Sequence, residues 1–491
     1  MSDTITIESA TRPHHRPLPS ADRRLAGPDP RIDPRRWWIL AVVVAAQFMF
    51  VVDAFVVNVA IPAIRVDLHA TAAEIEAVIA IYQIAFATMV IIGGRLGDIH
   101  GRKRMFIAGV LAFSATSLWC GASGSAIALI LGRLAQGATA ALMVPQVLAT
   151  IHTLFPDAAR ARAFGIFGVS LGLGGAAGLL LGGWLVTLNL AGLGWRGVFF
   201  VNLPVGAAIV AAAVALMPTG QMRPGTPLDI PGAGLLFLGL IGVIGPVMAG
   251  QQLHWPWWLW VVTVAATATL LLFPRFERSV ERRGGLPLID LALLGDRAFV
   301  RGLCALFCFH LGNSSFYLVM TLFMQNGLRF SPFASGLAVV PLALTFTLAS
   351  QLAARRAVRV GDRVLLEGNA VQFAGLVAIA LLIGVVDRPG IATMMLVLAL
   401  FGFGQGLVMA PLAGAVLATV HPAHAGSGSG LLSTAQQAAA AAGISLVGGI
   451  YFAARGTGTD RAGALAALTA LCVIAAATSF LLVRMRRACL G

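Results

Sequence analysis

Runs of apolar residues separated by short polar stretches recur along the chain from about residue 37 onward. Most of these runs approach the roughly 20 residues that a helix needs to cross a bilayer. The polar stretches between them are too short to form a soluble catalytic domain. The pattern predicts fourteen membrane-spanning helices, at approximately 37–64, 76–97, 105–122, 126–151, 162–186, 197–217, 230–250, 257–273, 299–325, 332–353, 365–386, 391–417, 430–452 and 462–483.

The overall composition leads to the same class of protein. Of the 491 residues, 58% are hydrophobic and 11% are charged, and the mean hydropathy is +0.88. A soluble domain of this composition would not have enough polar side chains to cover its surface. The expected fold class is therefore an all-α polytopic membrane protein.

The basic residues are distributed unevenly between the predicted loops. If the N-terminus is cytosolic, 27 of the 34 Lys and Arg residues lie in cytosolic segments and six lie in external loops, with Arg133 left inside the membrane. This bias predicts two cytosolic termini and a multi-pass protein of the plasma (inner) membrane, which the excess of Arg over Lys suggests is bacterial. The isoelectric point near 11.2 thus reflects topology, and we expect no nucleic-acid partner. Residues 1–36 are polar and non-periodic, and we predict a disordered cytosolic tail there.

A weak internal repeat divides the chain. The fourth span has Gln136-Gly137 followed by Pro145, and the twelfth has Gln405-Gly406 followed by Pro411, each before Val-Leu-Ala-Thr. Repeated halves are typical of secondary transporters, whose substrate site lies between the halves near the membrane midplane. We predict a six-helix bundle over 37–220, an inserted two-helix hairpin and linker over 221–284, and a second six-helix bundle with a short cytosolic tail over 285–491.

Asp53 is the one acidic residue that we place deep in a span; the other nineteen fall in the tail, in loops or at span ends. A charged side chain at the centre of a bilayer costs at least ~2.5 kcal/mol on insertion scales. Arg133 is the only basic residue that we place in the interior of a predicted span. A buried acid of this kind is expected where protons or cationic ligands are bound, because a carboxylate can hold one or the other.

The loop after the second span reads G-G-R-L-G-D-I-H-G-R-K-R-M-F, Gly93 to Phe106. It resembles the loop signature of the major facilitator superfamily, which implies a role in switching between inward and outward states; Ile99 departs from the signature. The matching residues are Gly94, Leu96, Asp98, Gly101, Arg102 and Lys103.

Two further spans resemble motifs of the same superfamily. The fourth has Leu129, Arg133, Gln136 and Gly137 at the spacing of a motif whose arginine is implicated in proton transfer. The fifth matches the spacing of the antiporter signature, although Leu179 replaces its proline. Small residues at such intervals let helices approach closely. The matching glycines are Gly165, Gly174, Gly178, Gly182 and Gly183.

The stretches Asp53–Ile64 and Trp195–Gly206 resemble the first and sixth helices of the fourteen-helix drug/proton antiporters, a multidrug efflux family. The resemblance covers nearly the whole chain from Trp37 onward. It implies a proton-coupled antiporter that exports lipophilic drugs, antibiotics or secondary metabolites by alternating access, with Asp53 as the carboxylate for proton or substrate and Arg133 as its partner in proton coupling.

Several polar residues are candidates for the substrate cavity besides Asp53. His310 is the one imidazole deep in a span, and it is equally consistent with a cavity position and with packing inside a helix bundle. The full set of candidates is Asp53, Asn58, Gln136, His310, Asn313 and Gln436. The expected partners are small amphiphilic substrates, protons and lipid, and the oligomeric state stays open.

Two other functions remain as alternatives. A proton-coupled importer of a small metabolite would fit the missing proline but not the fourteen-span plan. A membrane-embedded enzyme would need a site, and the one hint, His421 with His424, has no third metal ligand nearby. We predict neither a metal nor a cofactor.

Overall fold

The computed structural model describes residues 35–155, 157–189, 192–218, 228–250, 253–285, 287–289, 291–420, 425–456 and 458–490. Almost all of residues 1–36, predicted to be a tail, and both His421 and His424 lie outside them. The described residues form helices without strands, and fourteen of these helices are long and apolar enough to cross a membrane, which confirms the prediction.

The helix bounds agree with the apolar runs to within a few residues, and several helices extend further at their polar ends. The long helices are α1 (Arg36–Asp67), α2 (Ala72–His100), α3 (Arg102–Gly121), α4 (Ala126–Leu154), α5 (Asp157–Leu188), α7 (Asn202–Leu216), α8 (Ile230–Gly250), α9 (Trp257–Arg282), α11 (Arg297–Leu322), α12 (Pro332–Val360), α13 (Arg363–Val385), α14 (Ile391–Ala418), α15 (Ala425–Gly456) and α16 (Asp460–Leu490). Short segments are η2 (Gly194–Arg196), α6 (Gly197–Phe200), α10 (Leu291–Gly295) and η3 (Phe323–Gly327).

Polar residues fix several helix starts. Thr71 and Glu74 form a reciprocal capping box at α2, in which each side chain accepts a hydrogen bond from the other residue's backbone N–H. Ser125 and Ser331 cap α4 and α12 in the simpler way, by accepting one backbone N–H. Gly101 between α2 and α3 has a φ of 92°, a conformation that favours glycine.

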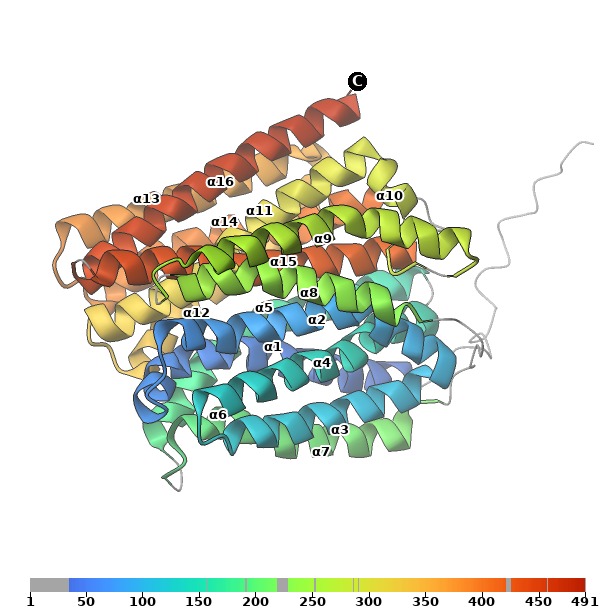
Figure 1. Cartoon of the computed structure of the whole chain (residues 1–491), viewed down its shortest axis with the longest axis horizontal. Helices are drawn as coiled ribbons and strands as arrows, with labels where there is room; N and C mark the ends of the chain where they lie inside the picture. Colours follow the sequence, from blue (N-terminus) through green and yellow to red (C-terminus); the bar gives the residue numbers. More distant parts are fainter. Residues whose placement is uncertain are drawn as a thin grey trace, which may run out of the picture.

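The helices form two groups that lie side by side in Figure 1. We call α1–α7 the first half and α11–α16 the second half. The hairpin of α8 and α9 lies between them and packs on both sides, against α2 and against α15. The halves meet through two main helix pairs, α2 with α15 and α5 with α12.

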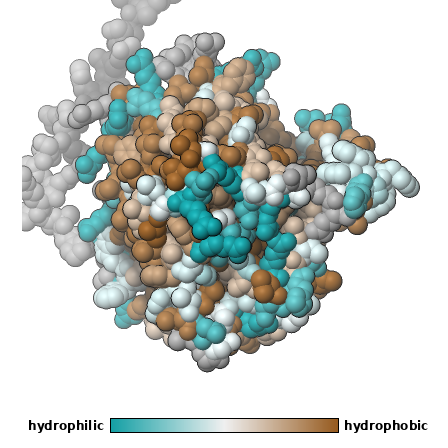
Figure 2. All heavy atoms as spheres, turned by 90° about the vertical axis from the view of Figure 1, so that its left-hand side faces the viewer, coloured by the Kyte–Doolittle hydropathy of each residue, from teal (hydrophilic) through white to brown (hydrophobic). Residues whose placement is uncertain are grey.

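We name each end of the bundle after a loop that lies there: the α1–α2 end holds the loop between α1 and α2, and the α2–α3 end, opposite to it, holds the loop between α2 and α3. At the α1–α2 end, which we predict to be external, hydrophilic residues gather near the middle of the face shown in Figure 2, with hydrophobic residues around them. Ion pairs at this end join Asp67 to Arg196 at 2.7 Å and Asp460 to Arg455 at 2.7 Å. The α2–α3 end carries the Gly93–Phe106 loop.

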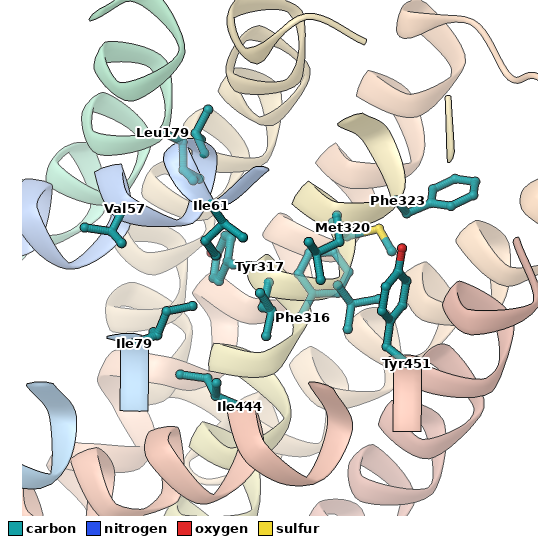
Figure 3. Packing of buried hydrophobic residues seen from close by; sticks show 14 of the residues in the cluster. Val57, Ile61, Ile79, Leu179, Phe316, Tyr317, Met320, Phe323, Ile444 and Tyr451 are labelled. Atoms are coloured by element: carbon teal, nitrogen blue, oxygen red, sulfur yellow. The ribbon is translucent and has the colours of Figure 1, made fainter. Parts of the chain in front are cut away.

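A buried apolar cluster joins the halves toward the α1–α2 end (Figure 3). It includes Val57 and Ile79 from the first half and Phe316, Ile444 and Tyr451 from the second. The π-helical turn η3 adds a polar link, because Gln325 Nε2 donates to the carbonyl oxygen of Val59 at 3.1 Å. At this end the halves are therefore in tight contact.

Candidate functional site

Asp53 lies in the middle of α1 and is completely buried. Its Oδ2 accepts a hydrogen bond from Arg133 Nη1 at 2.7 Å, which is also an ion pair. Its Oδ1 accepts from Gln136 Nε2 at 2.9 Å and from Asn202 Nδ2 at 2.7 Å. Both carboxylate oxygens thus have partners, as a buried charge requires.

Arg133 on α4 is 1% exposed, so it does not extend to a membrane surface. Its Nη1 also donates to Gln136 Oε1 at 2.6 Å, and its Nε donates to the Val78 carbonyl oxygen at 3.3 Å. The guanidinium carbon lies 3.9 Å from the centroid of the Tyr82 ring, within the range of a cation–π contact. The arginine is fixed from three sides by α1, α2 and its own helix.

Two members of this network were missing from the sequence prediction. Asn202 begins α7, and Ser117 lies on α3 with its side chain fully buried. Ser117 Oγ accepts from Gln136 Nε2 at 2.8 Å and from Asn202 Nδ2 at 3.2 Å. Asn202 lies inside the stretch that resembles the sixth antiporter helix, so that resemblance contained the signal; nothing in the sequence singled out Ser117.

The network joins four helices around one ion pair. Neutralising Asp53 with a proton would leave the Arg133 charge without its anionic partner in a buried position, where an unpaired charge is costly. Because α1, α3, α4 and α7 all contribute, a change at Asp53 acts on the packing of the first half.

The other predicted cavity residues do not join this hydrogen-bond network. Asn58 is 6% exposed and donates long hydrogen bonds of 3.4 Å to carbonyls of its own helix. His310 Nδ1 lies 3.0 Å from the Leu306 carbonyl oxygen on the same helix. Asn313 is buried and its Oδ1 has no hydrogen-bond partner among the described residues, while Gln436 is half-buried on α15.

The loop residues matched to the facilitator signature connect α2 and α3 to their neighbours. Arg102 lies 3.5 Å from Asp98 and donates to the Ala149 carbonyl oxygen of α4 at 2.9 Å. Lys103 Nζ donates to the carbonyls of Val214 and Met217 at the end of α7, at 2.8 and 2.6 Å. A cation there offsets the unpaired carbonyls of a helix C-terminus.

Gly94 of that signature lies on α2 beside Pro145 of α4. A Cβ there would be 3.7 Å from the Pro145 side chain, which is an ordinary van der Waals contact, so a small side chain would also fit at this position. Gly101 supplies the positive φ of the turn described above. The predicted gating residues thus tie the α2–α3 loop to two other helices of the first half.

A second buried polar cluster lies next to this loop. Asp229 at the start of α8 is 6% exposed, and Glu277 on α9 is completely buried. A Cβ at Gly232 would clash with carboxyl oxygens of both. Arg95 of α2 donates to the Pro287 carbonyl oxygen and lies close enough to interact electrostatically with both acids. The hydrogen bond from Arg95 thus connects α2 to the segment that follows α9, beside the two buried acids of the inserted hairpin.

The α5 glycines have different surroundings. Cβ atoms at Gly178 and Gly182 would lie 2.8 Å from carbonyl oxygens of α1, and one at Gly174 would lie 3.0 Å from Val51. Gly183 faces the start of α12, where a Cβ would clash with the Pro332 carbonyl oxygen. Gly165 has nothing within 4 Å.

Four of the five glycines thus sit where α5 closely approaches another helix. Leu179, which replaces the signature proline, is 1% exposed and belongs to the cluster that joins the halves. A Cβ at Gly336 of α12 would lie only 2.5 Å from the Leu179 carbonyl oxygen, so α5 and α12 also approach closely at this residue.

Comparison with known proteins agrees with this architecture. The family model described as Major Facilitator Superfamily matches residues 43–234 and again 232–444. The chain belongs to the major facilitator superfamily.

Relatives within the superfamily cover most of the chain. It is 37% identical over 468 residues to the "Probable actinorhodin transporter" of Streptomyces coelicolor, covering 94% of this chain and 80% of the relative. It is 34% identical to the "Puromycin resistance protein pur8" of Streptomyces alboniger, and the match covers 89% of this chain and 85% of that relative. A solved peptide transporter of the POT family shares the fold, with a TM-score of 0.65 and 18% identity over 92% of this chain and 96% of that one.

These findings confirm a multi-pass membrane protein of the facilitator fold, and the relatives are bacterial, as the sequence predicted. The roles of individual residues do not follow from family membership.

Proposed function

We propose that this facilitator is a proton-coupled exporter of antibiotics, drugs or related secondary metabolites, working by alternating access. The observation that carries the proposal is the buried pair of Asp53 and Arg133, held by amide donors from α4 and α7. A buried ion pair contributes little net stability compared with well-packed apolar residues. Stability of the fold therefore does not explain an ion pair in this position, and a function does. Proton binding is the function that a buried carboxylate inside a membrane is suited to perform.

The contacts assign different tasks to the two charges. Asp53 is completely buried, and its carboxylate is held by Arg133 on Oδ2 and by Gln136 and Asn202 on Oδ1. A cationic substrate that bound Asp53 directly would have to displace these donors. We therefore assign the proton to Asp53, and we assign to Arg133 and Gln136 the transmission of its charge state to neighbouring helices.

The substrate class rests on the relatives. Two relatives with more than 30% identity along most of the chain are named for actinorhodin transport and for puromycin resistance. A transporter confers resistance to a compound by moving that compound out of the cell. The direction of transport is accordingly proposed as export.

Uptake into inverted membrane vesicles tests the proposal. An acidic lumen should drive accumulation of members of a panel of fluorescent lipophilic dyes and aromatic antibiotics, and a protonophore should abolish it. Asp53→Asn should remove the gradient-driven component, because the amide cannot take up and release a proton.

The matched control is Asp67→Asn, the same change on the same helix at a carboxylate with 46% side-chain exposure that pairs with Arg196. This variant should retain gradient-driven uptake. Accumulation that persists in Asp53→Asn would refute the role of Asp53. Substrate movement only in the opposite direction would refute export.

A further inference from the structure

Glu76 is an acid that the network around Asp53 does not use. It lies one turn inside α2 from the α1–α2 end, and its position near a span end suggests exposure to water. In the structure it is 2% exposed. Its Oε2 is buried and has no hydrogen-bond partner among the residues that the structure describes.

The carboxyl group lies at the contact between the halves. A Cβ on Gly448 of α15 would be 3.1 Å from Glu76 Oε1 and 3.2 Å from Leu318 of α11. The absence of a side chain at Gly448 therefore provides the space that the Glu76 carboxyl occupies. The acid is enclosed by its own helix and by two helices of the second half.

Its surroundings are apolar. Ile75, Val78 and Ile79 are its neighbours on α2, and Leu318 of α11 lies beside the same Gly448 position; all four belong to one buried apolar cluster, part of which Figure 3 shows. A carboxylate buried among such side chains without a partner costs several kcal/mol, whereas the neutral acid avoids most of this cost.

The ionisable groups on the surrounding elements have other partners. Glu74 is engaged in the α2 capping box, and Arg133 pairs with Asp53. Arg455 and Tyr451 of α15 both contact Asp460 at the start of α16. Arg65 of α1 lies over the Phe452 ring, Tyr82 packs on Arg133, and on α11 Tyr317 donates to Gln405. Among the described residues, Glu76 forms no ion pair with any of these groups, because each of them is engaged elsewhere.

We infer that Glu76 is a second proton-binding residue of the transport cycle, and that its protonation is required for α2 to close against α15 at the α1–α2 end. This inference rests on the proposed alternating-access function. When the halves separate at this end, water reaches Glu76 and favours its carboxylate form. Closure must then return one proton to the group, so the closed-to-open ratio should fall up to tenfold for each pH unit of increase.

Distance measurements by electron spin resonance between the halves test this linkage without any substrate. Labels at Val66 and Val385 suit the purpose, because the two side chains are 75% and 80% exposed at the α1–α2 end of different halves. The protein would be the full chain in lipid nanodiscs, with its five native cysteines replaced. Lowering the pH should increase the closed population of the otherwise unchanged protein.

Glu76→Gln and Glu76→Leu should both hold the α1–α2 end closed at every pH, because neither side chain can ionise. Two variants are used because a buried Gln amide has its own hydrogen-bond requirement, which Leu lacks. The matched control is Glu74→Gln, two residues away, where Gln also completes the capping box. This control should keep the full pH response.

The proposal is overturned if a Glu76 variant keeps the pH response, if neither variant closes, or if Glu74→Gln loses the response as well. Failure of the proposed function would look different. Absence of proton-driven uptake by the unchanged protein would remove that function, whereas the pH-dependent distance change would still report on Glu76.

Discussion

Burial should decide the energy of the ion pair between Asp53 and Arg133, and the chain contains a matched pair to test this. Asp53 and Arg133 are 2.7 Å apart with side chains 0% and 1% exposed. Asp67 and Arg196 are also 2.7 Å apart, with side chains 46% and 30% exposed. The two pairs have the same chemistry and the same distance, so only their surroundings differ.

The perturbation is a double-mutant cycle at each pair, with Asp→Asn and Arg→Met. Removing one partner of a buried pair leaves an uncompensated charge and costs about 3–5 kcal/mol, while removing both is close to neutral. We expect Asp53→Asn and Arg133→Met each to destabilise the protein by about that amount, and the double variant to lose less than either. The coupling energy, which is the sum of the two single losses minus the loss in the double variant, should therefore exceed about 3–5 kcal/mol at the buried pair, against about 0.2–1 kcal/mol at the exposed pair.

The assay is unfolding by sodium dodecyl sulfate from mixed micelles, followed by tryptophan fluorescence. Gradient-driven uptake measured on the same samples separates folding from transport, since the double variant should fold well and still lack proton coupling. Equal coupling energies at the two pairs would refute the argument from burial. Proton-coupled uptake in the double variant would refute the role of the pair in transport.

Two further changes test other parts of the packing and the network. Asn202→Ala removes a hydrogen bond to the Asp53 carboxylate, and we expect it to lower the free energy of unfolding by about 1.5–3 kcal/mol in the same assay. A loss below about 0.5 kcal/mol would show that Asn202 is not an effective donor. Gly182→Ala would place a Cβ 2.8 Å from a carbonyl oxygen of α1, so we expect the free energy of unfolding to fall by about 1–3 kcal/mol because of overpacking. Gly165→Ala, with nothing within 4 Å of the new Cβ, should be neutral or slightly stabilising. Equal effects of the two variants on the unfolding midpoint would contradict this assignment.

The fold class was predictable because the constraint is local. Each span must satisfy its own backbone hydrogen bonds in lipid, so a long apolar run such as Trp37–Ile64 predicts a helix whatever its neighbours are. Helix starts at Thr71 and Ser125 also follow from a few adjacent residues. The energetic cost of burying Asp53 was likewise predictable, because a charge deep in an apolar run is costly in any arrangement of helices.

The partners of Asp53 and the burial of Glu76 were decided by tertiary structure. Asn202 is 149 positions from Asp53 along the chain, and only the packing of α7 beside α1 brings its amide to 2.7 Å. Glu76 is close to the end of its span, so the sequence suggests an exposed acid. In the structure α15 of the other half packs over it at Gly448 and buries it. Hydrophobic pattern determines where a helix lies relative to the membrane, and the contacts between helices determine which of its side chains meet.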